Sequence, residues 1–118
     1  MKIDKSLLSG STVLLVLSLL EEQDQYGYQM IATLARRSDR TFDLKEGTLY
    51  PILHTLEQRG HVSSYESEAP GSRRRKYYRL TRKGERLLAE KRVEWEAFAG
   101  AMQKVLNPQK PLTQPAQA

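Results

Sequence analysis

A run of basic residues followed by two tyrosines, residues 73–78, is the segment of this 118-residue chain best suited to binding chemistry. Guanidinium and ammonium groups placed close together bind phosphate oxygens, and tyrosine adds a hydroxyl group on a flat ring. The wider window of residues 73–92 holds ten basic and two acidic residues, a charge of +8, so the rest of the +5 chain carries −3. A patch confined to one region indicates a polyanionic partner more than general solubility.

The sequence around this run predicts a β-hairpin. We expect strands at residues 61–68 and 74–80, because a loop rich in breakers separates them. Tyr77 and Tyr78 would point to opposite faces of the second strand, one packed inward and the other facing solvent or DNA. A merely solvated basic loop is the alternative. Four cations at the hairpin tip would reach phosphates or a narrow minor groove: Arg73, Arg74, Arg75 and Lys76.

Ahead of the hairpin, residues 45–59 predict a helix with one apolar face and one polar face. Leu49, Leu53 and Leu56, with Ile52, follow helical spacing, and Gly60 is the expected stop. Because proline removes a backbone hydrogen bond, this helix would start late, near residue 47, or have kinked first turns. The opposite face would present small and polar side chains suited to a major groove, or else only a solvated surface. Its candidate DNA-binding residues are Gly47, Thr48, Tyr50, Pro51 and His54.

The other predicted helices carry more apolar surface than one small domain needs. The first, ending near Glu22, is apolar nearly all round, and residues 23–25 form a turn before a second helix that starts near Tyr26. Thr81 caps a long last helix with a sustained apolar stripe. We therefore expect a homodimer. Its candidate interface residues are Leu14, Leu17, Leu88, Trp95, Phe98 and Met102. Alternatively, Trp95 facing its symmetry mate would sandwich a small flat aromatic effector.

Nothing in the sequence predicts catalysis. The chain has no cysteine, and its two histidines, His54 and His61, accompany no nucleophile motif, phosphate loop or dinucleotide fingerprint. His54 with Glu57 is too small a ligand set for a metal site, and a surface pair on a helix explains it more simply. We expect no enzyme activity, no cofactor and no metal.

Two further expectations concern location and order. The longest apolar stretch, residues 12–20, is too short to span a bilayer, and the first residues make a poor signal peptide. We therefore expect a cytoplasmic protein that does not associate with membranes. Residues 107–118 contain three prolines and no core pattern, which predicts a disordered tail.

Together these segments resemble the PadR family of bacterial transcriptional regulators over residues 8–106. The most specific blocks are Gly47-Thr48-Leu49-Tyr50-Pro51 and Arg75-Lys76-Tyr77-Tyr78-Arg79-Leu80-Thr81, with Tyr26-Gly27 ahead of them and Gly84 and Trp95 after. The family commonly has histidine where this chain has Tyr26. The resemblance implies a homodimeric repressor that binds a roughly palindromic operator and dimerises through its last helix, helped by the first. In multidrug-sensing members, the tryptophan matching Trp95 lines a flat pore that accepts planar compounds; other members sense phenolic acids.

The predicted fold is mainly α with a small β-hairpin, a winged helix-turn-helix plus a long C-terminal dimerisation helix. We assign residues 1–80 to a winged-helix DNA-binding domain, 81–106 to the dimerisation helix and 107–118 to the tail. The expected partners are double-stranded DNA, a second copy of the chain and a possible small aromatic effector.

Overall fold

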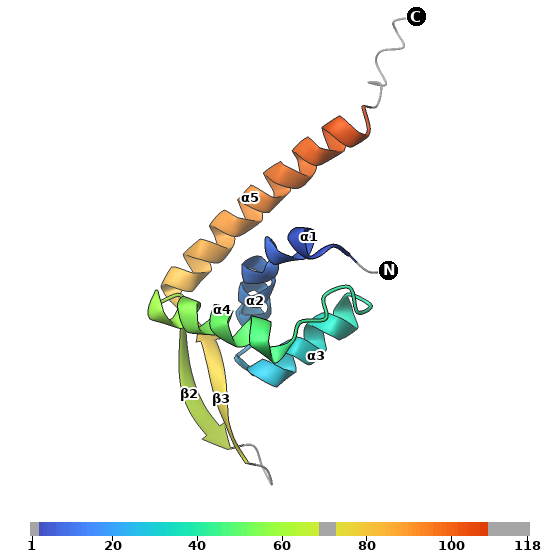
Figure 1. The fold of residues 1–118 in the computed structure, drawn as a ribbon. Helices are drawn as coiled ribbons and strands as arrows, with labels where there is room; N and C mark the ends of the chain where they lie inside the picture. Colours follow the sequence, from blue (N-terminus) through green and yellow to red (C-terminus); the bar gives the residue numbers. More distant parts are fainter. Residues whose placement is uncertain (1–2, 69–72, 109–118) are drawn as a thin grey trace, which may run out of the picture.

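A computed structural model describes residues 3–68 and 73–108, which form a mainly helical domain with a small antiparallel sheet (Figure 1). The helices are α1 (Lys5–Ser9), α2 (Thr12–Glu22), α3 (Gly27–Arg37), α4 (Glu46–Gln58) and α5 (Arg82–Leu106). The strands are β1 (Gln25–Tyr26), β2 (Val62–Glu68) and β3 (Arg74–Leu80), in the sheet order β1-β3-β2. The predicted winged helix with a long last helix is confirmed. Most of the predicted tail, residues 109–118, lies outside the described residues.

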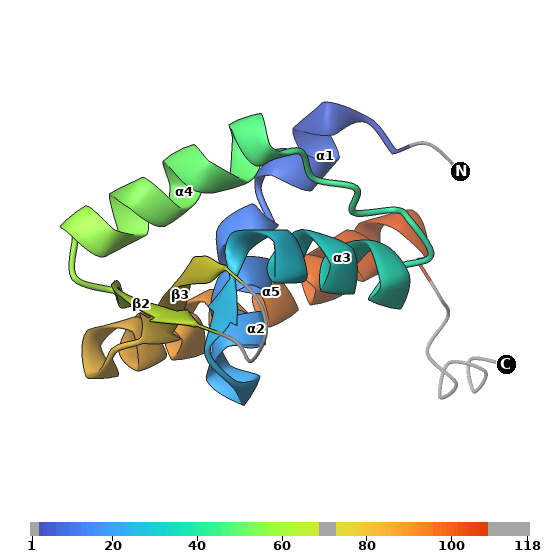
Figure 2. The ribbon, with the colours of Figure 1, turned by 90° about the horizontal axis from the view of Figure 1, so that it is seen from below.

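The hairpin and α5 extend from opposite sides of the domain (Figure 1). α4 forms an outer side of the domain, which is clearest when the molecule is seen from below (Figure 2). The fold therefore displays α4 and the hairpin near one another, while α5 projects away from both.

Two short elements were missed by the sequence prediction. α1 begins after Asp4, whose side chain accepts a hydrogen bond from the backbone nitrogen of Ser6 at 2.9 Å. The predicted turn at residues 23–25 is wrong at its end, because Gln25 and Tyr26 form β1 and pair with Tyr78 and Tyr77 of β3. A two-residue strand leaves no periodicity in a sequence, and only its partner strand defines it.

α2 lies at the centre of the core. Val16, Leu17, Leu19 and Leu20 are buried, and α2 contacts α3, α5 and β3. Three elements of the same chain therefore cover most of this helix, and Val13, Leu14 and Leu15 remain only partly buried, so less of its surface is free than the sequence predicted.

This packing corrects part of the predicted dimer interface. Leu17 is fully buried and Leu88 is 1% exposed, both in the core of their own chain. They have no surface left for a second copy, so we remove them from the interface. Leu14 is only partly buried and remains a candidate.

α4 stops just before Gly60, as predicted. Gly60 has a φ of +80°, a left-handed conformation that glycine adopts without strain. The backbone nitrogens of Gly60 and His61 donate to the carbonyl oxygens of Glu57 and Leu56 at 3.0 and 2.8 Å, the paired bonds of a Schellman motif. At the other end, the helix begins at Glu46, within one residue of the late start expected near residue 47, and it contains Pro51.

The start of α5 packs directly on the turn at Gly60 and His61 that follows α4. The Thr81 hydroxyl accepts a hydrogen bond from the backbone nitrogen of Gly84 at 3.0 Å and donates to the carbonyl oxygen of Gly60 at 2.7 Å. Burial, with repulsion from Lys83 and Arg59, lowers the pKa of His61. A Cβ on Gly84 would overlap the carbonyl oxygen of His61, so only glycine allows this approach. This corner, formed by Gly60, His61, Thr81 and Gly84, fixes where α5 and the hairpin leave the domain.

We predict that Gly84→Ala lowers the free energy of unfolding by roughly 3 kcal/mol, because its methyl group meets backbone that cannot move aside. Gly100→Ala is the matched control on the same helix, since a Cβ there meets nothing within 4 Å. The control should be neutral or stabilising by up to about 1 kcal/mol, from helix propensity alone. Urea denaturation followed by circular dichroism measures both changes. Equal stability of the two variants would contradict this account of the corner.

Candidate nucleic-acid interface

The outer face of α4 is the first part of the candidate interface. Its inner face buries Leu49, Leu53 and Leu56 at 0–4% exposure, and Ile52 is partly buried. All five residues predicted to read DNA are exposed: Gly47, Thr48, Tyr50, Pro51 and His54. Burying one side of the helix thus turns the predicted contact residues outward, where they can meet the floor of a major groove.

Tyr50 has a packing role that the sequence did not reveal. Its side chain is 41% exposed, yet a Cβ added to Gly27 at the start of α3 would lie 2.9 Å from ring atom Cε1 of Tyr50 and closer still to the hydroxyl end. Partial burial raises the pKa of the Tyr50 hydroxyl. The Tyr26-Gly27 and Gly47–Pro51 blocks of the sequence therefore meet in space, and Tyr50 braces α4 against α3 as well as facing outward.

The hairpin is the second part of the interface, and its two faces differ. Along β3, Tyr78 is buried at 4% exposure while Tyr77 is partly exposed, as the predicted alternation requires. Arg75 and Tyr77 therefore share the outer face of the sheet, and Arg74 and Lys76 share the inner face, which turns toward α4. Three of the four cations predicted to act alike are therefore divided between two different environments, and Arg73 lies just before β3.

The outer face is built from stacked aromatic rings. Tyr77 meets Tyr26 edge to face at 5.4 Å between centroids and stacks on Tyr65 at 5.7 Å. The guanidinium carbon of Arg75 lies 4.4 Å from the centroid of the Tyr26 ring, in a cation–π arrangement. The rings hold the hairpin to β1, and they hold Arg75 near the start of α3 instead of leaving it free in solvent.

Asp24 closes the far end of this ladder. It accepts a hydrogen bond of 2.6 Å from the Tyr65 hydroxyl, which raises the pKa of Tyr65, and it lies 3.6 Å from the guanidinium Nε of Arg79. Arg79 in turn lies over the Tyr65 ring. None of Asp24, Tyr65 or Arg79 was singled out from the sequence, because their partners come from separate segments.

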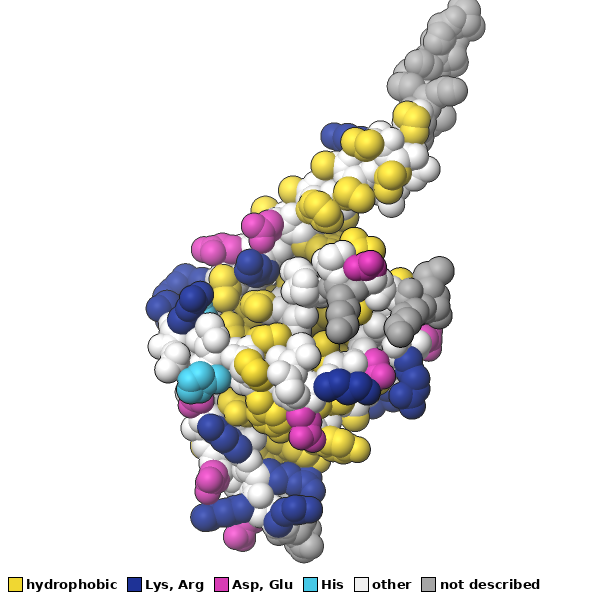
Figure 3. All heavy atoms as spheres, viewed as in Figure 1, with side chains coloured by type: hydrophobic (Ala, Val, Ile, Leu, Met, Phe, Trp, Pro, Cys, Tyr) yellow, Lys and Arg dark blue, Asp and Glu magenta, His cyan; other side chains and the backbone are white. Residues whose placement is uncertain are grey.

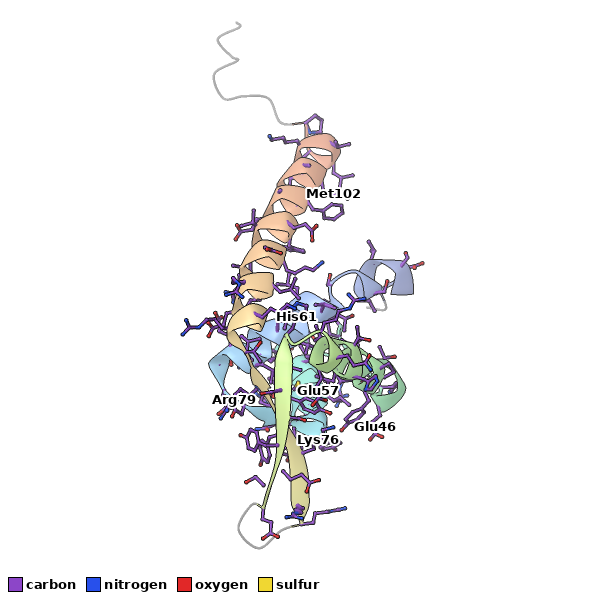
Figure 4. The ribbon with its side chains drawn as sticks, turned by 90° about the vertical axis from the view of Figure 1, so that its left-hand side faces the viewer. Glu46, Glu57, His61, Lys76, Arg79 and Met102 are labelled. Atoms are coloured by element: carbon purple, nitrogen blue, oxygen red, sulfur yellow. The ribbon has the colours of Figure 1, made fainter. Side chains whose placement is uncertain are left out.

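On the inner face, two predicted DNA-binding cations already have carboxylate partners. Arg74 Nη1 lies 3.5 Å from Glu66 on the neighbouring strand, and Lys76 Nζ lies 3.8 Å from Glu57 of α4. Glu57 and Lys76 lie near each other beside the hairpin (Figure 4). Acidic side chains also sit among the basic ones on the hairpin surface (Figure 3). The hairpin is thus less positive than its run of cations suggests. Arg73 is exposed and directly follows residues 69–72, which lie outside the described part of the chain.

The outer part of α5 presents large apolar side chains to solvent in the single chain (Figure 3). Trp95, Phe98 and Met102 are 49%, 59% and 39% exposed, and their spacing places them on one side of the helix. All three predicted interface residues on this part of α5 therefore lie on a free surface of the described chain.

Among residues 3–68 and 73–108, no three His, Cys, Asp or Glu side chains gather closely enough to hold a metal ion. His54 and Glu57 do not form such a site, because Glu57 is engaged by Ser64 and Lys76. In the described part of the chain, no helix has both the length and the apolar character needed to cross a membrane.

An outward-facing helix beside a basic hairpin, on this order of elements, defines a winged-helix DNA-binding protein. The chain belongs to the transcriptional regulator PadR-like family, whose family model matches residues 16–90.

Solved structures of similar proteins agree. A transcriptional regulator from Clostridium thermocellum is 34% identical, with a TM-score of 0.79 over 86% of this chain and 96% of that one. A PadR family transcription regulator from Clostridium difficile is 37% identical, with a TM-score of 0.71 over 82% and 99%. One from Eggerthella lenta is 36% identical, with a TM-score of 0.76 over 88% of each chain.

Proposed function

We propose that this protein is a homodimeric transcriptional repressor that binds a roughly palindromic operator in the cytoplasm, and that it is not an enzyme. The observation that carries the proposal is the exposed face of α4 beside a basic hairpin in the same domain. Residues 1–80 would be the DNA-binding domain and residues 81–106 the dimerisation helix.

The two parts of the interface have different roles in this proposal. The α4 residues Thr48, Tyr50 and His54, with Gly47 and Pro51 allowing close approach, face base edges in the major groove. The hairpin contacts phosphates or the minor groove and fixes orientation without reading much sequence. Its contributing residues are Arg73, Arg74, Arg75, Lys76 and Tyr77.

Replacing Arg74 and Arg75 together by alanine should weaken binding to every DNA sequence. The variant should also flatten the dependence of log affinity on log salt by up to about two units, since each phosphate contact contributes about 0.9. Thr48→Ala provides the contrast, because it should weaken operator binding more than binding to random DNA. Fluorescence anisotropy over a salt series, on an operator selected from genomic fragments, measures both. An unchanged slope, or equal losses for Thr48→Ala on both DNAs, would contradict these roles.

The exposed stripe of α5 supports the dimer. An apolar surface of this size on a small protein marks an interaction site, and its position on a projecting helix suits a second copy of the same helix. Leu14 and Leu7, which are partly and largely exposed near the start of the chain, are available to join it. Two copies joined in this way would set the spacing between two α4 helices on DNA.

Phe98→Glu should convert the dimer to a monomer, because the variant would bury an unpaired charge in the seam. Operator affinity should then fall by roughly 100-fold, since linked half-sites no longer bind together. Ala97→Glu adds the same charge about 100° around α5 from Phe98, outside the stripe of Trp95, Phe98 and Met102, and should leave the dimer intact. Analytical ultracentrifugation gives the oligomeric state. A dimeric Phe98→Glu protein, or a monomeric Ala97→Glu protein, would refute the assignment of the seam.

A second candidate function, sensing a flat aromatic compound between the two copies, is favoured by Trp95. Its indole ring is half exposed on the proposed seam, where it could stack on a planar ligand. Such a ligand would release or strengthen operator binding by favouring one dimer geometry.

Trp95 is the only tryptophan, so its fluorescence reports directly on this site. Planar cationic dyes or phenolic compounds should quench or shift its emission at saturable concentrations, and an aliphatic cation of similar charge should not. Emission that stays unchanged with every planar compound would count against an effector site at Trp95, without affecting the DNA-binding proposal.

A further inference from the structure

Glu57 connects the helix proposed to read DNA with both strands of the hairpin. Its carboxylate oxygen Oε2 accepts a hydrogen bond of 2.6 Å from the Ser64 hydroxyl of β2, and Oε1 lies 3.8 Å from Lys76 Nζ of β3. Glu57 sits one residue before the end of α4, where the helix approaches the base of the hairpin. One side chain thus bridges three elements that the DNA-binding proposal treats as two separate contact surfaces.

The surroundings of Lys76 distinguish it from the other hairpin cations. Its ammonium group lies near Glu57 on one side and 5.5 Å from the centroid of the Tyr78 ring, and Glu66 is its cross-strand neighbour. The Glu57 side chain is 34% exposed, about half the exposure of Glu66, which pairs with Arg74 at the end of the hairpin nearer residues 69–72. Because Ser64 fixes the Glu57 carboxylate, Lys76 is attracted to a stationary anion on α4.

We propose that Glu57 is a positioning residue that determines sequence specificity by holding Lys76 against α4. This inference rests on the proposed DNA-binding function and deepens it. Lys76, the cation nearest α4 on the inner face, then meets a phosphate only when the DNA backbone lies in the position that α4 sets by reading the bases. Wrong sequences lose this contact, while the operator keeps it.

The physical reason is the freedom of a lysine side chain. A long, flexible chain with a point charge follows any nearby phosphate once it is released, and such contacts carry no sequence information. A fixed carboxylate limits this freedom and also repels DNA backbone that approaches out of position. An interface discriminates between DNA sequences by repelling the wrong arrangement of the backbone as well as by attracting the right one.

The first test is Glu57→Gln, which removes the charge while its amide oxygen can still accept the Ser64 hydrogen bond. Affinity for random DNA should rise about threefold to tenfold, and the salt dependence on random DNA should steepen by about one unit, as expected for one added phosphate contact. Operator affinity should change less, so the ratio of operator to random affinity falls. Fluorescence anisotropy over a salt series measures all three quantities, with circular dichroism to show that the variant is folded.

Two further variants separate this mechanism from a general effect of removing negative charge. Glu46→Gln neutralises the first residue of the same helix, which makes no ion pair within the described chain, and should leave the affinity ratio nearly unchanged. Lys76→Gln should lower operator affinity more than random affinity. In the Lys76→Gln background, Glu57→Gln should have no further effect on the salt slope, which a double-mutant cycle measures directly.

The outcomes are distinct. Wild-type protein that binds no DNA would overturn the proposed function and this inference together. This inference alone would be overturned if the wild-type protein binds DNA but Glu57→Gln leaves the ratio of operator to random affinity and the salt slope unchanged. The same conclusion would follow if Glu57→Gln had an equal effect in the Lys76→Gln background. If Glu57→Gln fails to fold, the Lys76→Gln variant decides. Equal losses of affinity for operator and random DNA would contradict the proposal that Glu57 holds Lys76 against α4.

Discussion

Burial of one face of α4 is the interaction on which the rest of the interface depends. Leu49, Leu53 and Leu56 together remove enough apolar surface from water to contribute several kcal/mol, roughly 1.5–3 for each side chain. The same burial sets the rotation of the helix, and therefore which side chains face outward. A helix that carries a contact surface on one side must be anchored on the other, and here the anchor lies in the core around α2. The position of the outward face is thus a consequence of core packing.

The hairpin is held to that frame by contacts of a different kind. Its outer face rests on the Tyr26–Tyr77–Tyr65 stack and its base on the corner formed by Thr81 and Gly84. Both are short-range contacts that restrict geometry more than they add apolar burial. They place a charged surface at a constant distance from α4, which a binding site made of two separate elements requires. α5 leaves the same corner, so the direction of α5 is set by the contacts that also set the hairpin.

The positive charges of the interface are distributed less evenly than its net charge indicates, because individual cations have different partners. A count of residues predicts a uniformly positive hairpin, yet Arg74 and Lys76 have carboxylates within 4 Å, and Arg75 lies on an aromatic ring. Exposed ion pairs of this kind contribute little to stability, so their effect on binding is the more important one. Opposite charges within a DNA-binding surface reduce attraction to any polyanion and leave more of the affinity to geometry.

The order of the main elements, the two faces of α4, the stop at Gly60 and the family could all be predicted from the sequence, because they depend on local spacing, turn chemistry and motifs. The prediction from the sequence overestimated the free surface of α2, since the neighbours that cover a helix are distant in the chain, and for the same reason it placed Leu17 and Leu88 at a dimer seam. Three features are visible only in the folded chain: β1 joins the sheet, Tyr50 meets Gly27 and Glu57 meets Lys76. Each of these is a contact between segments far apart in sequence, formed when the core brings the elements together, and spacing along one chain carries no record of it.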